Sequence, residues 1–204
     1  MKGYLLQKTR MNLLSKCLQG GQVKQATDLD HVLRILVGDY MKQIYSSRPR
    51  DALGQLHQCC TSKPRGRVSN SRANLPRNID ENDSVEELIP EVEVDTVEDK
   101  VYRDLFFWAI LTNRIEMAQV FLSYMKNRIC AALIASKVFK SYISYAQDNE
   151  SKELLTSQGE QFETYANECL KSCYNYEEET ACEIAIRRIN LFGSVTCLQV
   201  LLRK

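Results

Sequence analysis

The feature that most constrains the fold is the helical spacing of apolar residues in the second half of the chain. Between residues 105 and 129, two sets of apolar side chains each recur every three or four positions. The sets are Leu105, Trp108, Leu111, Ile115, Ala118, Leu122, Met125 and Ile129, and Phe106, Ile110, Met117 and Phe121. Two apolar stripes predict burial on more than one side. The polar pair Asn113-Arg114 is typical of a tight turn, so we expect a helical hairpin rather than one long helix.

Helical spacing continues beyond the hairpin and breaks at the polar pair Asp148-Asn149. The residues that carry it are Ala132, Ala135, Phe139, Tyr142 and Ala146 before the break, and Leu155, Phe162, Ala166, Cys169 and Cys173 after it. No stretch alternates convincingly with the period of two that marks a strand. The sequence therefore predicts an all-α fold, an irregular, solenoid-like stack of antiparallel helical hairpins.

Capping signals predict where the last helices begin and end. Asn175 is expected to cap a helix, with Glu178 as its capping-box partner three residues on. The pair Arg187-Arg188 is expected in the last turn, where positive charge suits the helix dipole. Gly193 is expected to end this helix. A short final helix is expected from about Ser194.

Composition divides the chain into three zones, 1–57, 58–100 and 101–204. The first zone is predicted to be a short helical segment with Asp28 or Asp30 as its N-cap. Its apolar stripe consists of Leu29, Val32, Leu33, Leu36 and Val37. This zone is too short to bury its apolar face alone, so we expect it to pack against another part of the protein.

The zone 58–100 is predicted to be a disordered linker that is first basic and then acidic. Its basic residues are Lys63, Arg65, Arg67, Arg72 and Arg77, and its acidic residues are Asp80, Glu81, Asp83, Glu86, Glu87, Glu91, Glu93, Asp95, Glu98 and Asp99. Low hydrophobicity and blocks of like charge leave little to offset the entropy lost on ordering. The alternative is a regulatory or docking segment.

Charge and hydropathy exclude several classes of protein. The 27 Lys and Arg residues against 26 Asp and Glu residues give a net charge of +1, which lacks the basic surplus of a nucleic-acid-binding domain. The N-terminus shows no leader-peptide pattern. The uncharged runs 105–113 and 117–125 reach only about half of the ~20 residues that a membrane-spanning helix needs. We therefore expect an intracellular chain without a membrane span or a nucleic-acid partner.

The eight cysteines are predicted to be reduced thiols. They are Cys17, Cys59, Cys60, Cys130, Cys169, Cys173, Cys182 and Cys197. Several lie in helical patterns, where a thiol packs as a small apolar group, and a chain of this length can build a core without disulfides. Cys169 and Cys173 are one helical turn apart with Cys182 nearby. Packing explains them more simply than a thiol switch does.

The sequence predicts no active site. His31 and His57 are the only histidines, and no second pair of ligands completes a zinc site at His57, Cys59 and Cys60. There is no recognisable pairing of nucleophile and base, and no phosphate-binding loop. We therefore expect no catalytic, cofactor-binding or metal-binding residues, no cofactor and no enzymatic activity.

The last zone contains a series of short motifs in a fixed order. They are Trp108-Ala109-Ile110, Asn113-Arg114, Met117-Ala118, Ala131-Ala132-Leu133-Ile134-Ala135-Ser136-Lys137, Cys173-Tyr174, Glu178, Ala181 and Thr196-Cys197-Leu198-Gln199. Their order and spacing resemble the cytosolic helical region that precedes the pore in melastatin-type transient receptor potential (TRPM) cation channels. Upstream, Leu36-Val37-Gly38-Asp39 and Tyr45 resemble a segment of the same arm. The chain departs from the family at Phe192-Gly193, where Trp-Gly is usual, and after Gln199.

The resemblance implies a non-catalytic scaffold and coupling segment of a calcium-permeable cation channel. It also implies that the pore lies outside these 204 residues, as in a fragment, a truncated isoform or an incomplete gene model. Its partners would be other domains and subunits of a tetrameric channel, at the cytosolic face of a membrane; alone, the chain would be cytoplasmic. The alternative is a free-standing helical-repeat adaptor that binds other proteins.

Overall fold

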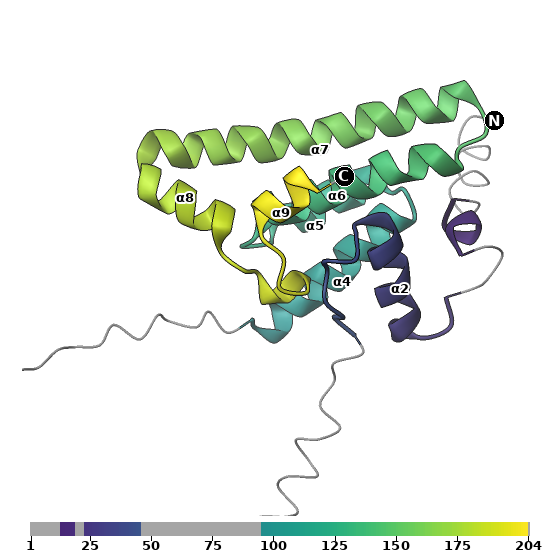
Figure 1. Ribbon diagram of the computed structural model, residues 1–204, viewed down its shortest axis with the longest axis horizontal. Coiled ribbons are helices and arrows are strands. Elements are labelled where there is room, and N and C mark those ends of the chain that lie inside the picture. Colours follow the sequence, from purple (N-terminus) through teal and green to yellow (C-terminus); the bar gives the residue numbers. More distant parts are fainter. Residues whose placement is uncertain (1–12, 19–22, 46–94, 204) are drawn as a thin grey trace, which may run out of the picture. The chain divides into compact units, whose positions relative to one another are not determined.

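The computed structural model describes residues 13–18, 23–45 and 95–203, and in this part of the chain the fold is helical (Figure 1). Residues 13–17 form one helical turn. The elements that follow are α2 (Ala26–Leu36), α4 (Val97–Leu111), α5 (Ile115–Ser123), α6 (Arg128–Tyr142), the 3₁₀ turn η1 (Ile143–Tyr145), α7 (Asn149–Tyr176), α8 (Glu178–Ile186), the 3₁₀ turn η2 (Asn190–Phe192) and α9 (Cys197–Leu202). The described residues contain no strand, only an isolated bridge between Ile189 and Val195. The predicted all-α stack is confirmed.

Helix α6 is the centre of the packed core. Eleven of its side chains are buried, and it packs against α2, α4, α5, α7 and α9. The small residues Ala131, Ala132 and Ala135 let neighbouring helices approach closely. At the other end, Phe139 stacks on Phe162 of α7 with ring centroids 5.6 Å apart. Because α6 is buried over most of its surface, it becomes stable only when other helices pack around it.

The helical hairpin predicted at Asn113-Arg114 is confirmed as α4 and α5. Asn113 adopts a left-handed backbone with φ of 53°, a conformation that Asn tolerates better than most residues. Thr96 caps α4 and accepts the backbone N–H of Asp99 at 3.2 Å. Helix α4 therefore begins at Val97, inside the range predicted as linker. The rest of that range, up to residue 94, lies outside the described residues.

Helix α7 begins at the predicted break, where Asp148 accepts the backbone N–H of Ser151 at 2.7 Å. Its buried residues form a single stripe, and the helix lies alongside α6 over much of its length (Figure 1). The predicted cap at Asn175 is wrong because α7 continues through it to Tyr176. The residue with the extended backbone that a cap requires is Glu177, with φ of −155°.

The end of α8 also differs from the prediction. The helix stops at Ile186, so Arg187 is its C-cap and Arg188 lies outside it. Gly193 instead ends the 3₁₀ turn η2, with φ of 73°. The final helix α9 is present, with Thr196 as its N-cap. The helix ends earlier because the chain turns at residues 189–195 to reach α9, and the isolated bridge closes this turn.

The segment 23–45 belongs to the same compact unit as 95–203. This agrees with the expectation that the first zone packs against another part of the protein. Helix α2 forms as expected, but neither Asp28 nor Asp30 is its N-cap. The N-cap is Gln25, and Asp28 accepts the backbone N–H of Gln25 at 3.0 Å. Asp30 is buried and accepts the backbone N–H groups of Ile44 at 2.7 Å and Tyr45 at 3.1 Å.

Two of the long-range hydrogen bonds that attach this segment to the rest of the fold are made to backbone carbonyls. Ser141 of α6 donates its hydroxyl to the carbonyl of Leu36 at 2.6 Å. The backbone N–H of Lys42 donates to the carbonyl of Gly193 at 2.9 Å. The second bond brings two backbones into direct contact, so the chain needs a residue without a side chain at position 193.

We expect Gly193→Ala to lower the free energy of unfolding by about 1–3 kcal/mol, because Ala is strained at positive φ and its Cβ would overlap the carbonyl oxygen of Lys42. In a chain of this size, each 1 kcal/mol lowers the melting temperature by roughly 2–4 °C. Circular dichroism of the full chain during thermal unfolding measures the change.

The matched control is Gly159→Ala in α7. There an added Cβ meets only ordinary contacts, 3.4 Å from Lys140 and from Ser136. Ala should leave stability unchanged or raise it by up to about 1 kcal/mol, because Gly is unfavourable inside helices. Equal effects of the two substitutions would contradict the close backbone contact at Gly193.

Candidate functional site

The described residues offer no metal or membrane site. Among residues 13–18, 23–45 and 95–203, no three His, Cys, Asp or Glu side chains are grouped so that they could hold a metal ion. No described helix has both the length and the apolar character needed to cross a membrane. His31 is exposed on α2. His57, Cys59 and Cys60, where the sequence argued against zinc, lie outside the described residues.

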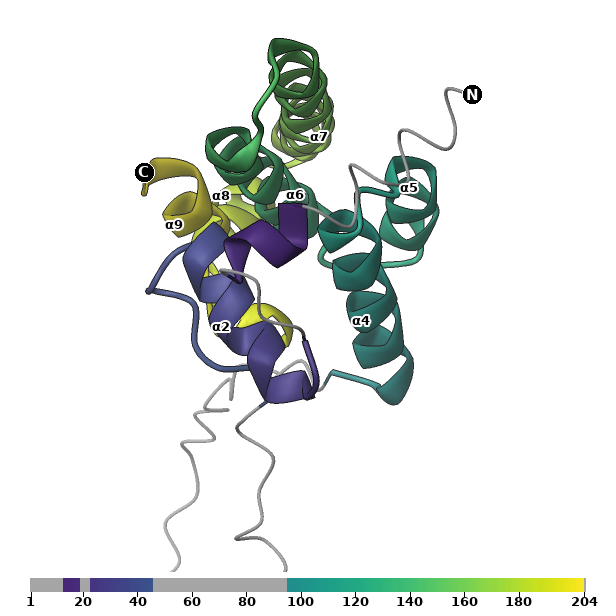
Figure 2. The ribbon, with the colours of Figure 1, turned by 90° about the vertical axis from the view of Figure 1, so that its right-hand side faces the viewer.

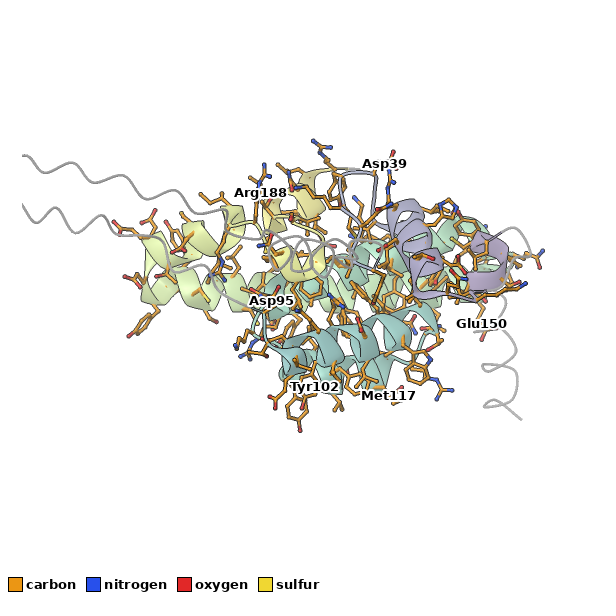
Figure 3. The ribbon with its side chains drawn as sticks, turned by 90° about the horizontal axis from the view of Figure 1, so that it is seen from below. Asp39, Asp95, Tyr102, Met117, Glu150 and Arg188 are labelled. Carbon is orange, nitrogen blue, oxygen red and sulfur yellow. The ribbon has the colours of Figure 1, made fainter. Side chains whose placement is uncertain are left out.

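The α4–α5 hairpin carries an exposed apolar surface, here called the hairpin surface. It consists of Val97, Val101, Leu105 and Trp108 on α4, and Met117, Val120 and Tyr124 on and just after α5. Their spacing of three and four positions places each set along one side of its helix. Figure 3 shows Tyr102 of α4 and Met117 of α5 along the same edge. A solvent-facing helix side would ordinarily be polar, so this surface is a candidate contact site.

Part of this surface was predicted to be buried. Leu105 is 38% exposed and Trp108 is 43% exposed, although both belong to the first apolar stripe of the sequence. Helix α4 instead packs its other stripe inward, so Phe106 and Ile110 are fully buried. Within α4, the first stripe reaches the core only at the end of the helix, where Leu111 is 2% exposed.

Contacts between the two helices hold the hairpin surface in place. The rings of Tyr102 and Tyr124 stack in parallel, with centroids 5.2 Å apart. The guanidinium of Arg114 lies over the Trp108 ring, 4.9 Å from its centroid. Lys126 pairs with Asp99 at 3.5 Å and so joins the start of α4 to the segment after α5. These contacts make the apolar side chains a preformed surface.

Helix α9 carries a second, smaller apolar surface. Leu198, Leu201 and Leu202 are 43%, 50% and 67% exposed, whereas Cys197 and Val200 pack inward. Figure 2 shows α5 and α9 on opposite sides of α6. This smaller apolar surface therefore belongs to a helix on the other side of α6 from α5.

A cavity of about 540 Å³ lies between the start of α6, the second half of α7, α8 and the start of α9. Its volume falls within the range of small-molecule sites. Four cysteines line it, Cys130, Cys169, Cys173 and Cys197. The charged lining residues are Lys126, Arg128, Glu168 and Arg187.

The side chains of Cys130 and Cys197 shift each other's pKa. The interaction with Cys197, followed by burial, raises the pKa of Cys130 well above its usual value. The interaction with Cys130, together with the backbone N–H of Cys197 and the nearby Arg187, lowers the pKa of Cys197.

The sequence singled out a different set of cysteines. Of those, Cys169 and Cys173 line the cavity, whereas Cys182 is exposed and does not. Cys130 and Cys197 were missed because they lie on different helices far apart in the sequence, and no local pattern connects them. The six described cysteines are all free thiols.

Comparison with known proteins identifies relatives of this chain. Residues 3–203 match the protein family described as TRPM2-like domain. Rat transient receptor potential cation channel subfamily M member 2 is 33% identical over 100 residues, covering 49% of this chain and 7% of the relative. Human subfamily M member 5 is 32% identical over 99 residues, covering 48% and 8%. Subfamily M member-like 2 of Nematostella vectensis is 30% identical over 103 residues, covering 48% and 7%. The chain thus matches less than a tenth of the length of these relatives.

The only tryptophan of the chain, Trp108, reports directly on the hairpin surface. We expect acrylamide to quench its fluorescence in the folded chain almost as readily as in the urea-unfolded chain, because nearly half of the side chain is exposed. Strong protection from quenching that disappears on dilution would mean that a second copy covers this surface. Strong protection at all concentrations would contradict the exposed position.

The capping carboxylate of Asp99 should make α4 sensitive to pH. Its hydrogen bonds with the Thr96 side chain and backbone, and the nearby Lys126, lower the pKa of Asp99. A lowered folded-state pKa adds stability above the unfolded value of about 3.9, and that stability is lost as the pH falls through the folded value.

Asp99→Asn should therefore lower the melting temperature at pH 7 and have a shrinking effect as the pH falls below about 4. Glu98→Gln is the matched control, since Glu98 is exposed in the same first turn. Thermal unfolding of both variants across this pH range provides the measurement. A pH-independent difference for Asp99→Asn would show that shape rather than charge matters at this cap.

Proposed function

The chain belongs to the TRPM2-like domain family, and we propose that it acts as a non-catalytic cytosolic scaffold and coupling segment of a calcium-permeable TRPM-type cation channel. The hairpin surface is the observation that carries this proposal. Exposed apolar side chains that gather on one surface mark sites of protein contact. The relatives are named as cation channel subunits, so the partners we propose are other domains and subunits of a tetrameric channel.

A coupling role requires contact with two neighbours and a rigid connection between them. The hairpin and α9 each carry apolar residues, and α5 and α9 lie on opposite sides of α6 (Figure 2). Helix α6 packs directly against α4, α5 and α9. A displacement of the hairpin would therefore be transmitted to α9 through a close-packed core. We propose that this route transmits movement towards a pore that other parts of the channel supply.

The alternative, a free-standing adaptor, would use the same apolar surfaces with unrelated partners. The two functions differ in their dependence on a channel. A coupling segment should support cation currents only within a complete channel polypeptide, whereas an adaptor should tolerate its absence. A current in cells that express these 204 residues alone would contradict the proposal that the pore lies elsewhere.

Replacing the matched segment of the rat relative with this chain should give a channel that assembles and conducts. Within that chimera, Val120→Glu should reduce tetramer assembly and whole-cell current, because it places a charge on the hairpin surface at a side chain that is 55% exposed. Native gels measure assembly, patch-clamp recording measures current, and circular dichroism of the chain alone verifies folding.

Gln119→Glu is the matched control, because Gln119 lies next to Val120 on α5 and its side chain is also exposed. It adds the same charge outside the hairpin surface, and we expect assembly and current to remain at the level of the unsubstituted chimera. If Val120→Glu behaved in the same way as Gln119→Glu, the hairpin surface would have no role in the channel and the adaptor function would be favoured.

A further inference from the structure

The wall of the cavity includes two cysteines that lie one turn apart on the same helix. Cys169 and Cys173 both belong to α7, which is continuous from Asn149 to Tyr176. Residues four positions apart in a helix lie on the same face, with Cβ atoms about 5–6 Å apart. Both cysteines are half-buried free thiols, and both line the cavity of about 540 Å³. The fold therefore presents two neighbouring thiols to one cavity.

The spacing of the two thiols limits the chemistry that they can perform together. A disulfide needs Cβ atoms about 3.5–4.5 Å apart, which is less than the helical spacing of about 5–6 Å. Joining Cys169 directly to Cys173 would therefore distort α7. A single atom that bonds to both sulfurs avoids this distortion, because it lengthens the link between the two side chains.

The number of thiols limits the bridging atom further. A structural zinc site needs four protein ligands, and the described residues contain no group of three His, Cys, Asp or Glu side chains that could hold a metal ion. Cys130 and Cys197 also line the cavity, but they belong to α6 and α9. A trivalent arsenic atom that carries one organic group has two valences left for thiols, and it therefore matches a pair on one helix.

The cavity also has apolar contacts for that organic group. Ile129 of α6, Ile184 of α8 and Ile189 line it together with the thiols. Ile129 and Ile189 belong to the buried core, and Ile184 packs against it. These side chains would remove a small apolar substituent on the arsenic atom from water, which favours binding. Because such a reagent is neutral, its binding does not depend on the charged residues of the lining.

We propose that Cys169 and Cys173 form a dithiol site for neutral trivalent arsenicals with one organic substituent, which bridge the two sulfurs and place the substituent in the cavity. The inference rests on the helical spacing of the thiols, the cavity that they share and its apolar lining. It does not depend on the function proposed above.

The reaction is an exchange of ligands on arsenic, without oxidation or reduction. The reagent carries its organic group and two hydroxyl groups on arsenic. Each thiol forms one sulfur–arsenic bond, and each new bond displaces one hydroxyl group. The two thiol protons leave with the two hydroxyl groups as two water molecules. The product holds both cysteine sulfurs and the organic group on one arsenic atom, and it closes a ring across one turn of α7.

The test uses the full chain with Cys59, Cys60 and Cys182 changed to Ser, which removes an adjacent pair of cysteines and the exposed thiol. The probe is phenylarsine oxide, which becomes the dihydroxide in water. Mass spectrometry of the intact chain should show one adduct per chain. Labelling with iodoacetamide, followed by peptide mapping, should then find Cys169 and Cys173 protected by the probe.

Single substitutions in this parent chain test the need for both thiols. Cys169→Ser and Cys173→Ser should each weaken binding of the probe by about 100-fold or more, because two linked attachment points gain at least this much over one. Cys130→Ala is the matched control, since Cys130 lines the same cavity from α6 but is fully buried. It should bind the probe as the parent chain does.

A further comparison tests the spacing itself. Glutathione disulfide should not produce a Cys169–Cys173 disulfide in the folded chain, because the helix keeps the two Cβ atoms too far apart. The disulfide should form in the urea-unfolded chain, where the helix no longer holds the thiols apart. Circular dichroism verifies that each variant is folded, and the labelling of the parent chain gives the same assignment should Cys130→Ala fail to fold.

Three results would overturn the proposal. The first is that the probe protects Cys130 or Cys197 in place of Cys169 and Cys173. The second is that either single Ser variant binds the probe as tightly as the parent chain, which would mean that one thiol is sufficient. The third is that a Cys169–Cys173 disulfide forms readily in the folded chain, because the two thiols would then lie closer together than helical spacing allows.

Discussion

The structure depends on the burial of most of α6. Residues 130–132, 134 and 135 have no exposed surface, and five helices from both halves of the described chain surround them. The buried hydroxyl of Tyr142, at the end of the helix, donates a hydrogen bond to the carbonyl of Leu111 at 3.1 Å. Burying each of these side chains contributes roughly 0.8 kcal/mol per methylene group, so the neighbouring helices are held by a shared core rather than by their own propensities.

This arrangement explains why an N-terminal segment belongs to a core built mainly from the C-terminal half. Helix α2 covers one side of α6 with Val32, Leu33 and Leu36, which are at most 1% exposed. The buried carboxylate of Asp30 then orders the chain after the helix, because it accepts the backbone N–H groups of Ile44 and Tyr45. A carboxylate is costly to bury unless it is hydrogen-bonded in this way, so α2 and its following segment are stable only as one unit.

The sequence predicts turns and helix ends that depend on neighbouring residues. It fails where contacts with distant parts of the chain determine the structure. The turn at Asn113 and the break at Asp148 were predicted correctly because the polar residue itself adopts the required backbone or accepts the N–H group that caps the next helix. Asn175 had equally good capping chemistry, but α7 continues because the helix is already packed along α6. The pattern likewise showed two apolar stripes on α4 without showing which one would meet α6. That Cys130 and Cys197 line one cavity could not be predicted, since only the fold brings α6 and α9 together.

Helix α9 joins the core to one of the two exposed apolar surfaces. Its inward residues Cys197 and Val200 are buried, whereas Leu198, Leu201 and Leu202 are exposed. The helix has only six residues and packs against α6 and α8. A helix of this length is not stable alone in water, so the core determines where its leucines lie. A neighbour that contacts these leucines would therefore act on the packing between α9 and α6.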